Sequence, residues 1–437
     1  MDFTYCKLED ILSDIHSGGT PSTTEKQYWG GNIKWLSSGE TGQRFISDTI
    51  DKITEDGVKN SSTKLAKKNN IVMACAGQGK TRGQTSFLLD DMYINQSVIV
   101  LEPNASVLPL YLFYNLSSRY DELRGGSDAS STRGSITTTA LKKLSFRYPN
   151  LTIQTKIVDI LFAYDDLIEN NNKRIALLEK AAQELYKEWF VRFRFPGYEK
   201  AKFVNGIPEG WTVGKAGELC EIITGRKDAN EATGGRYPFF TCARETTLST
   251  DDFILNTNAI LISGNGSYTG LVKKYSGKMD LYQRTYALHS FKNVQWLYLY
   301  WVFKINFERQ FMGGSTGCAI PYITKPNIFN FKVIIPTEDL QLKAQAQFEL
   351  IHTKTRILEV QNQNLIKQRD LLLPRLMSGK LEIDVESVNE EKETNKVISF
   401  ELFKQEFKFA ARADNALSDD DVKNLYEAYC NDKCKKE

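Results

Sequence analysis

The chain has 437 residues, of which 41% are hydrophobic and 25% are charged, and its formal net charge is +2. This length favours two or three domains, and the composition is typical of a globular protein. The sequence shows neither a signal peptide nor an apolar stretch long enough to span a membrane, so we expect a cytoplasmic protein without a membrane partner. The seven cysteines and three histidines show no metal-ligand spacing, which argues against a structural metal site or a disulfide framework.

The first chemical motif along the chain is IVMACAGQGKTRG at 71–83, which has the spacing of a phosphate-binding P-loop. A P-loop needs a buried strand before the glycine turn and a helix directly after it, because the helix N-terminus helps to hold the phosphates. The stretch NNIVMACA can form the strand, but Gly83, Thr85 and Ser86 are poor residues for the start of a long helix. The motif alone leaves a nucleotide-hydrolysing enzyme open.

The same stretch belongs to an internal repeat. With a shift of 187 residues it lies over NAILISGNGSYTG at 258–270, and Gln96 matches Gln283. Three pairs of glycines coincide in this alignment: Gly77 with Gly264, Gly79 with Gly266, and Gly83 with Gly270. The second copy has Ser267 where the first has Lys80, so the lysine of a P-loop is not repeated. The shared feature is a strand with a glycine turn, which makes a nucleotide-binding enzyme the unfavoured alternative.

Each copy begins with a mixed domain. Short alternating strands and turn-rich loops predict an α+β domain at 1–149 and a second one at 196–336. Near the start, DILSDIHSG matches GELCEIITG with a shift of 207 instead of 187, so the first copy carries about 20 extra residues before Ile71.

Each domain is followed by a long helix, predicted at 150–195 and at 337–383 and free of glycine and proline in its interior. Apolar residues recur in steps of four and three from Ile157 to Trp189 and from Ala344 to Leu376, which is typical of a coiled-coil seam. An amphipathic helix lying on its own domain is the alternative.

We expect the two helices to pair antiparallel. This pairing places Asn171 opposite Asn362, the only asparagines of the seam, whereas parallel pairing would leave both buried amides without partners. It also returns the chain to its first domain and relates the two domains by a pseudo-twofold axis. The remaining residues, 384–437, form an acidic tail for which we expect helical structure but no particular role.

Two repeated α/β domains separated by two long helices resemble the specificity subunit of type I restriction–modification systems. Three stretches carry the resemblance in the family's order: SGGTPSTTEKQYWGGNIKWLSSGE at 17–40, NGIPEGWTVGKAGEL at 205–219 and LLLPRLMSGKLEI at 371–383. One departure is that the family often has Glu-Gln after the proline that closes each domain. Here Gln154 and Gln341 lack the preceding glutamate, which puts a contact at the helix start in doubt.

The resemblance implies a non-catalytic subunit that binds double-stranded DNA. Each target-recognition domain would recognise one half of a bipartite asymmetric site, while the helices dock two methyltransferase subunits. Restriction subunits with motor activity would join the complex. The chain itself would bind no cofactor, because S-adenosylmethionine, ATP and Mg²⁺ would be held by the partners. The alternatives are the specificity half of a single-chain restriction enzyme, a scaffold that binds proteins instead of DNA, and the P-loop enzyme.

DNA sequence is recognised by polar and cationic side chains that reach base edges from loops, while other groups hold phosphates. We therefore predict the DNA contacts on the two glycine turns, on the loops rich in small residues and on nearby arginines. In the first copy they are Arg44, Gln78, Lys80, Arg82, Ser131 and Arg133; in the second, Arg226, Asn265, Tyr268, Arg284, Thr316 and Tyr322.

Overall fold

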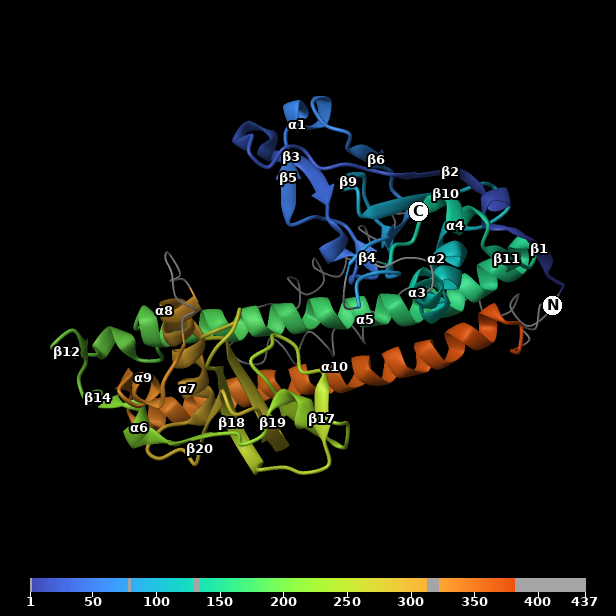
Figure 1. Ribbon diagram of the computed structural model, residues 1–437. Coiled ribbons are helices and arrows are strands. Elements are labelled where there is room, and N and C mark those ends of the chain that lie inside the picture. The colour runs from blue at the N-terminus through green and yellow to red at the C-terminus, as the bar shows by residue number, and fades with distance from the viewer. Residues whose placement is uncertain (1, 78–79, 129–133, 313–321, 382–437) are drawn as a thin grey trace, which may run out of the picture. The chain divides into compact units, whose positions relative to one another are not determined.

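The computed structural model describes residues 2–77, 80–128, 134–312 and 322–381 (Figure 1). The chain divides into two units, Met1–Phe162 with Arg369–Glu437, and Ala163–Gln368. The predicted DNA contacts Gln78, Ser131, Arg133 and Thr316 lie outside the described residues, as does the tail 384–437.

The first unit is built on a five-stranded and a four-stranded sheet. The strand order of the five-stranded sheet is β2 (Leu12–Ser17), β10 (Val98–Pro103), β7 (Ile71–Ala74), β8 (Thr85–Leu88), β4 (Phe45–Ile46). The strand order of the four-stranded sheet is β5 (Asp51–Ile53), β3 (Trp29–Leu36), β9 (Met92–Ile94), β6 (Lys64–Ala66). A separate pair joins β1 (Thr4–Lys7) to β11 (Ser145–Tyr148), and the helices before the long one are α1 (Glu55–Lys59), α2 (Pro109–Ser118), α3 (Tyr120–Asp128) and α4 (Thr138–Lys142). All four residues of β7 are buried, as its unbroken apolar sequence predicts.

The second unit is built on a six-stranded sheet. Its strand order is β15 (Glu221–Thr224), β20 (Thr285–His289), β18 (Leu255–Ser263), β19 (Val272–Leu281), β16 (Tyr237–Phe240), β17 (Leu248–Thr250). Outside this sheet, β14 (Thr212–Lys215) pairs with β21 (Lys332–Ile335), and β12 (Phe203–Val204) pairs with β13 (Ile207–Pro208). The short α-helices of this unit are α6 (Ala216–Leu219), α7 (Trp296–Val302), α8 (Glu308–Met312) and α9 (Lys325–Phe329). The mixture of helices and sheets confirms the predicted α+β class.

The strand pairing confirms the internal repeat. The strand before each glycine turn pairs with the strand that begins near the matched glutamine, β7 with β10 and β18 with β20. Strand β3 pairs parallel to β9 in the first unit, and β16 pairs parallel to β19 in the second. One ten-residue strand, β19 at 272–281, takes the place that β8 and β9 fill between 85 and 94, which is the same shift of 187.

The glycine turns correspond less simply than the sequence alignment predicts. The Gly83 N–H donates to the Ala74 carbonyl at 2.9 Å, and the Gly270 N–H donates to the Ser263 carbonyl at 2.8 Å. Gly83 and Gly270 have nearly the same left-handed φ, +87° and +90°. Because 83 − 74 is nine and 270 − 263 is seven, the first turn is two residues longer. The predicted match of Gly77 with Gly264 is therefore wrong, and Cys75 occupies the place of Gly264.

The chain after the first glycine turn forms a strand, β8, and not a helix. A P-loop requires a helix N-terminus at this point to hold phosphate groups. The described residues after the turn therefore do not supply the helix that a P-loop needs, in agreement with the preference drawn from the repeat.

The two long helices form as predicted, with small differences at their ends. Helix α5 runs over Leu151–Tyr186 and continues as a π-helical turn at Lys187–Val191, and α10 runs over Glu338–Met377. Contrary to the expectation that their interiors are free of proline, α10 contains Pro374. Proline has no N–H to donate to the Asp370 carbonyl, so α10 continues through Pro374 to Met377 with one backbone hydrogen bond fewer. All the predicted seam positions are buried or half-buried.

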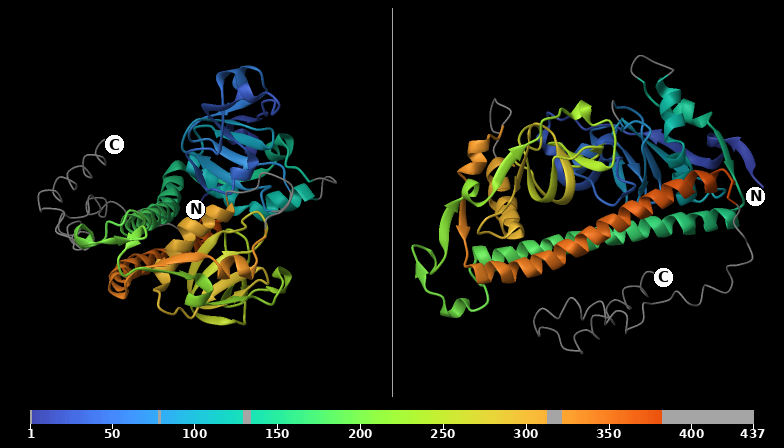
Figure 2. Two further views of the ribbon diagram at one scale, coloured as in Figure 1. Left: turned by 90° about the vertical axis from the view of Figure 1, so that its left-hand side faces the viewer. Right: turned by 90° about the horizontal axis from the view of Figure 1, so that it is seen from below.

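The helices are antiparallel in the second unit, where they run side by side (Figure 2). Asn171 Nδ2 donates to Asn362 Oδ1 at 2.9 Å, and both side chains are buried. Near the C-terminal end of α5, Ala182 lies in one core cluster with Ala344 from the start of α10. Within the first unit, Ile157 shares a core cluster with Leu376. The predicted direction and register are confirmed.

None of the helices in the described part of the chain is long and apolar enough to cross a membrane.

Candidate nucleic-acid interface

Several loops of the second unit converge around its glycine turn, at 264–270. The Gly264 N–H donates to the Arg284 carbonyl at 2.9 Å, and the Ile323 N–H donates to the Gly264 carbonyl at 2.8 Å. The Gln283 N–H donates to the Lys227 carbonyl at 3.0 Å. We call the segments 225–228, 241–247, 264–270, 282–284 and 322–324 the second loop cluster.

The second loop cluster brings together five predicted DNA contacts. Arg226 and Arg284 are exposed, and Asn265 is half-buried. The two tyrosines are exposed to different extents, Tyr268 at 37% and Tyr322 at 72%. Guanidinium, amide and phenol groups that face solvent from neighbouring loops are suited to base edges and phosphates.

The buried carboxylate of Asp280 fixes one loop of this cluster. Lys227 Nζ lies 2.8 Å from Asp280 Oδ2, and the hydrogen bond to this carboxylate raises the pKa of Lys227. Asp280 is fully buried, so an uncompensated charge there would be costly. Lys227 therefore has a structural role, whereas the side chain of its neighbour Arg226 is exposed at the surface.

The first unit repeats the backbone frame of the second. The Ile136 N–H donates to the Cys75 carbonyl at 2.9 Å, as the Ile323 N–H does to the Gly264 carbonyl. Lys80 is exposed on the turn, and its carbonyl accepts a hydrogen bond of 2.9 Å from the hydroxyl of Tyr120. The turn of the first unit therefore presents a cation where the second unit presents Ser267.

Two predicted DNA contacts of the first unit are held inside the domain. Arg82 is only 6% exposed, and its Nη1 donates to the Gly134 carbonyl at 2.6 Å. A Cβ atom on Gly134 would lie 1.9 Å from that nitrogen, so only glycine leaves room for the guanidinium. Arg44 is half-buried, with its guanidinium 4.9 Å from the centre of the Phe113 ring. These placements favour positioning roles over direct contact with bases.

Gln96 holds the loop that follows β2, and Gln283 holds the loop that follows β15. Gln283 Nε2 donates to Asp228 Oδ2 at 3.0 Å, and the hydroxyl of Thr20 donates to Gln96 Oε1. The sequence reveals their match in the repeat but not this role, because each partner lies far away in the chain and the two partners differ in type.

Gln154 and Gln341 form a second pair of matched glutamines, and each makes hydrogen bonds near the start of a long helix. Gln154 is fully buried, where its Oε1 accepts the Leu108 N–H at 2.8 Å and its Nε2 donates to the Pro149 carbonyl at 2.9 Å. Gln341 makes the same two contacts with the Gln295 N–H at 3.0 Å and the Pro336 carbonyl at 2.9 Å. The contact at the helix start that the missing glutamate put in doubt is thus present in both copies.

Among the described residues no group of three or more His, Cys, Asp or Glu side chains is arranged to hold a metal ion. Four cysteines lie in the described part of the chain, and none of them forms a disulfide: Cys6, Cys75, Cys220 and Cys242.

Two repeated domains with one backbone frame and different side chains at the turns, joined by paired helices, define a two-domain recognition protein. The sequence matches the type I restriction modification DNA specificity domain over residues 1–180 and 208–368. The chain therefore belongs to this family, whose members are the DNA-recognition subunits, and not the catalytic ones, of type I restriction–modification systems.

Individual relatives agree with this assignment. The chain is 26% identical over 421 residues to the MjaIX specificity subunit of Methanocaldococcus jannaschii, which covers 88% of this chain and 94% of that protein. A stretch of 189 residues, 42% of this chain and 41% of the relative, is 34% identical to the EcoDI specificity subunit of Escherichia coli. The fold is similar to that of an S subunit from M. genitalium, with a TM-score of 0.52 and 17% identity over 86% of this chain and 96% of that one.

Proposed function

We propose that this DNA specificity subunit recognises a bipartite asymmetric sequence, one half with each domain. The repeat gives both domains the same backbone frame around a glycine turn. The side chains presented on that frame differ, with Lys80 in the first domain and Asn265, Tyr268 and Tyr322 in the second. A shared backbone frame with different exposed side chains supports recognition of two different half-sites, because base edges are distinguished by side-chain donors and acceptors.

The single observation that carries this proposal is the paired hydrogen-bond frame. The Ile136–Cys75 and Ile323–Gly264 bonds each tie the strand–turn junction to the segment before a short helix. A backbone hydrogen-bond frame that is the same in both domains, with different exposed side chains, is expected where selection acts on the side chains of the loops. We assign direct DNA contact to the exposed residues Lys80, Arg226, Tyr268, Arg284 and Tyr322.

The paired helices have a second role in this proposal. Outside the seam, α5 and α10 carry exposed apolar side chains, among them Leu177 at 66% and Leu371 at 70% exposure. Where exposed apolar side chains gather on one surface, they favour contact with another protein. The occupants that we propose are two methyltransferase subunits, with restriction subunits added to the complex. S-adenosylmethionine, ATP and Mg²⁺ would be bound by those partners, and the complex would act in the cytoplasm.

Methylome sequencing tests the proposed function. A host that expresses this chain with its partner methyltransferase is expected to carry adenine methylation at one sequence made of two specific parts and a nonspecific spacer. The same host without the gene for this chain is the control and should lack that methylation. Methylation at a continuous or palindromic sequence, or its persistence in the control, would contradict the proposal.

A further inference from the structure

A cavity of about 270 Å³ lies next to the second loop cluster, within the second unit. Its walls come from the loop at 241–247, from the start of β19 and from both long helices, and they include Arg244, Lys273, Glu179 and Arg356. It is therefore built where the second domain meets its supporting helices.

The cations around this cavity fall into two groups. Lys274 Nζ lies 2.6 Å from Glu179 Oε1, and Lys304 Nζ lies 2.7 Å from Glu308 Oε2, so both are neutralised by carboxylates. Arg244 and Arg356 are exposed and form no ion pair with any residue that the structure describes.

The half-buried Lys273 has only a carbonyl as its hydrogen-bond acceptor. Lys273 Nζ donates to the Ala243 carbonyl at 2.6 Å, and burial lowers its pKa. The lowered pKa means that the nearby carboxylate of Glu245 does not fully compensate the desolvation of this cation. The exposed carboxylate of Glu359 also lines the cavity but forms no ion pair with Arg244 or Arg356. Together with Glu245, whose charge also acts on Lys273, two uncommitted carboxylates thus stand against three cations, and the remaining positive charge suits an anion.

The cavity is continuous with the residues to which we assign DNA contact. Leu271, Val272 and Lys273 directly follow the glycine turn, and Cys242 Sγ contacts the Arg284 carbonyl at 3.3 Å. Phosphates flank base edges in duplex DNA and receive at least half of the hydrogen bonds from bound proteins. Cations beside loops that reach base edges are therefore in the place that phosphate contacts require.

The repeat shows that this arrangement belongs to the second domain alone. With the shift of 187, Lys273 corresponds to Ser86 and Arg356 corresponds to Glu169. Ser86 is fully buried, and Glu169 has the opposite charge. Lys273 and Arg356 are therefore no part of the common fold, because the first copy has no cation at either position.

We propose that Arg244, Lys273 and Arg356 form a phosphate-binding site for the DNA backbone next to the half-site of the second domain. This inference rests on the proposed function, because it takes DNA as the source of the phosphate. Arg244 and Arg356 supply exposed guanidinium groups, while Lys273 holds the loop that carries Arg244 and adds its charge.

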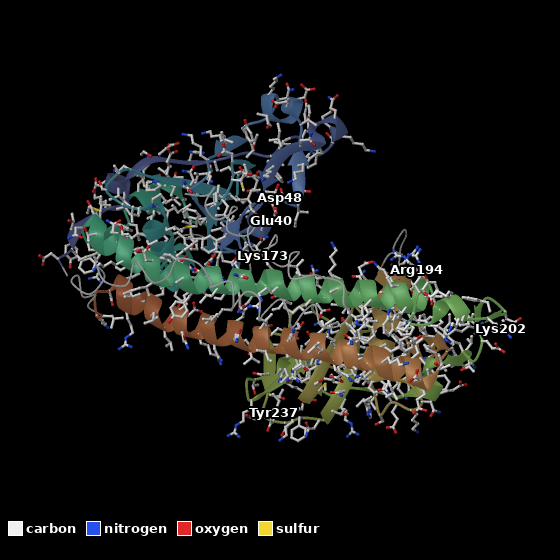
Figure 3. All side chains as sticks on the ribbon, turned by 180° about the vertical axis from the view of Figure 1, so that it is seen from behind. Glu40, Asp48, Lys173, Arg194, Lys202 and Tyr237 are labelled. Carbon is white, nitrogen blue, oxygen red and sulfur yellow. The ribbon has the colours of Figure 1, made fainter. Side chains whose placement is uncertain are left out.

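The test is the salt dependence of DNA binding by the full chain. A duplex of random sequence is titrated with the wild type, with Arg244→Gln/Arg356→Gln and with a control, at several salt concentrations. Each lost phosphate contact lowers the slope of log K against log salt by about one, so the double variant should lose about two. The control, Lys173→Gln/Lys202→Gln, removes the same charge from exposed positions of the same unit (Figure 3).

The outcomes separate this inference from the proposed function. A wild-type slope near zero would overturn the proposed function and the phosphate site together. A steep wild-type slope that falls equally in the double variant and in the control would overturn only the phosphate site. If the double variant keeps the salt-dependence slope of the wild type but no longer associates with the methyltransferase, the cavity is a protein-docking surface. The proposal would then be wrong. In the expected result the slope falls only in the double variant and the methylated sequence stays unchanged.

Discussion

Replacing Gln154 with leucine is expected to destabilise the first unit by about 3 kcal/mol. Leucine is close to glutamine in size but cannot bind the Leu108 N–H or the carbonyls of Ser106 and Pro149, which Gln154 contacts at 2.8, 3.1 and 2.9 Å. Buried polar groups left without partners cost roughly 1–3 kcal/mol each. The loss falls at the start of α2, since Leu108 is the residue that caps this helix.

Hydrogen exchange measures this effect locally. In the wild type the Leu108 amide should be protected, and in Gln154→Leu it should exchange as a loop amide does, with a lower denaturation midpoint for the first unit. Gln361→Leu on α10 is the matched control, because its side chain is exposed and surface changes usually alter stability by less than about 0.5 kcal/mol. Equal protection of Leu108 in wild type and variant would show that the buried amide is not needed for the cap.

Replacing Asn171 alone with leucine should destabilise the helix pair more than replacing both Asn171 and Asn362. The single change removes the donor at 2.9 Å from Asn362 Oδ1 and leaves this buried oxygen unpaired, at a cost of about 1–3 kcal/mol. The double change puts two leucines side by side in an apolar seam, which restores a satisfied contact. Asn362 Nδ2 keeps its bond to Asn172 Oδ1 in the single variant, which limits the loss.

A double-mutant cycle on the unfolding of the full chain measures this coupling. We expect an interaction energy of about 1 kcal/mol or more, within the range seen for residues in contact. Asn170→Leu, on the exposed side of the same helix turn, is the control and should change stability little. Strict additivity of the two seam substitutions would mean that the asparagine pair does not set the register.

The helix pair could be predicted in detail because a seam is a one-dimensional pattern. Two helices with matching spacing have few possible registers, and the two asparagines distinguish between them. The buried Asn171–Asn362 contact follows from that constraint alone. The end of α10 was less predictable, because proline usually ends or kinks a helix, whereas here the helix continues for three residues beyond Pro374.

The glycine turn shows where such reasoning stops. The first turn is longer by two residues, and a shift of two leaves every strand side chain on the same face of the sheet. All four residues of β7 are buried, so no alternation of polar and apolar residues marks the register. Matching glycines therefore favoured Gly77 over Cys75 as the partner of Gly264, and only the hydrogen bonds reveal the true correspondence.

The placement of the arginines also depends on contacts that are remote in sequence. Arg82 is buried because Gly134, 52 residues away, leaves room for its guanidinium. Arg44 packs on Phe113, which lies in a different element. An exposed and a buried arginine look alike in a polar loop sequence. The loops that form the site could be predicted, whereas the direction of each side chain could not.

An exchange of one domain tests the central claim, that each domain recognises its own half-site. Residues 1–149 are replaced by the first domain of another specificity subunit, and the methylome of the host is sequenced. The account predicts that one half of the methylated sequence changes while the other half and the spacer length stay the same, and that exchange of 196–336 changes only the opposite half. If a single exchange altered both halves, the two domains would not act independently and the account would be wrong.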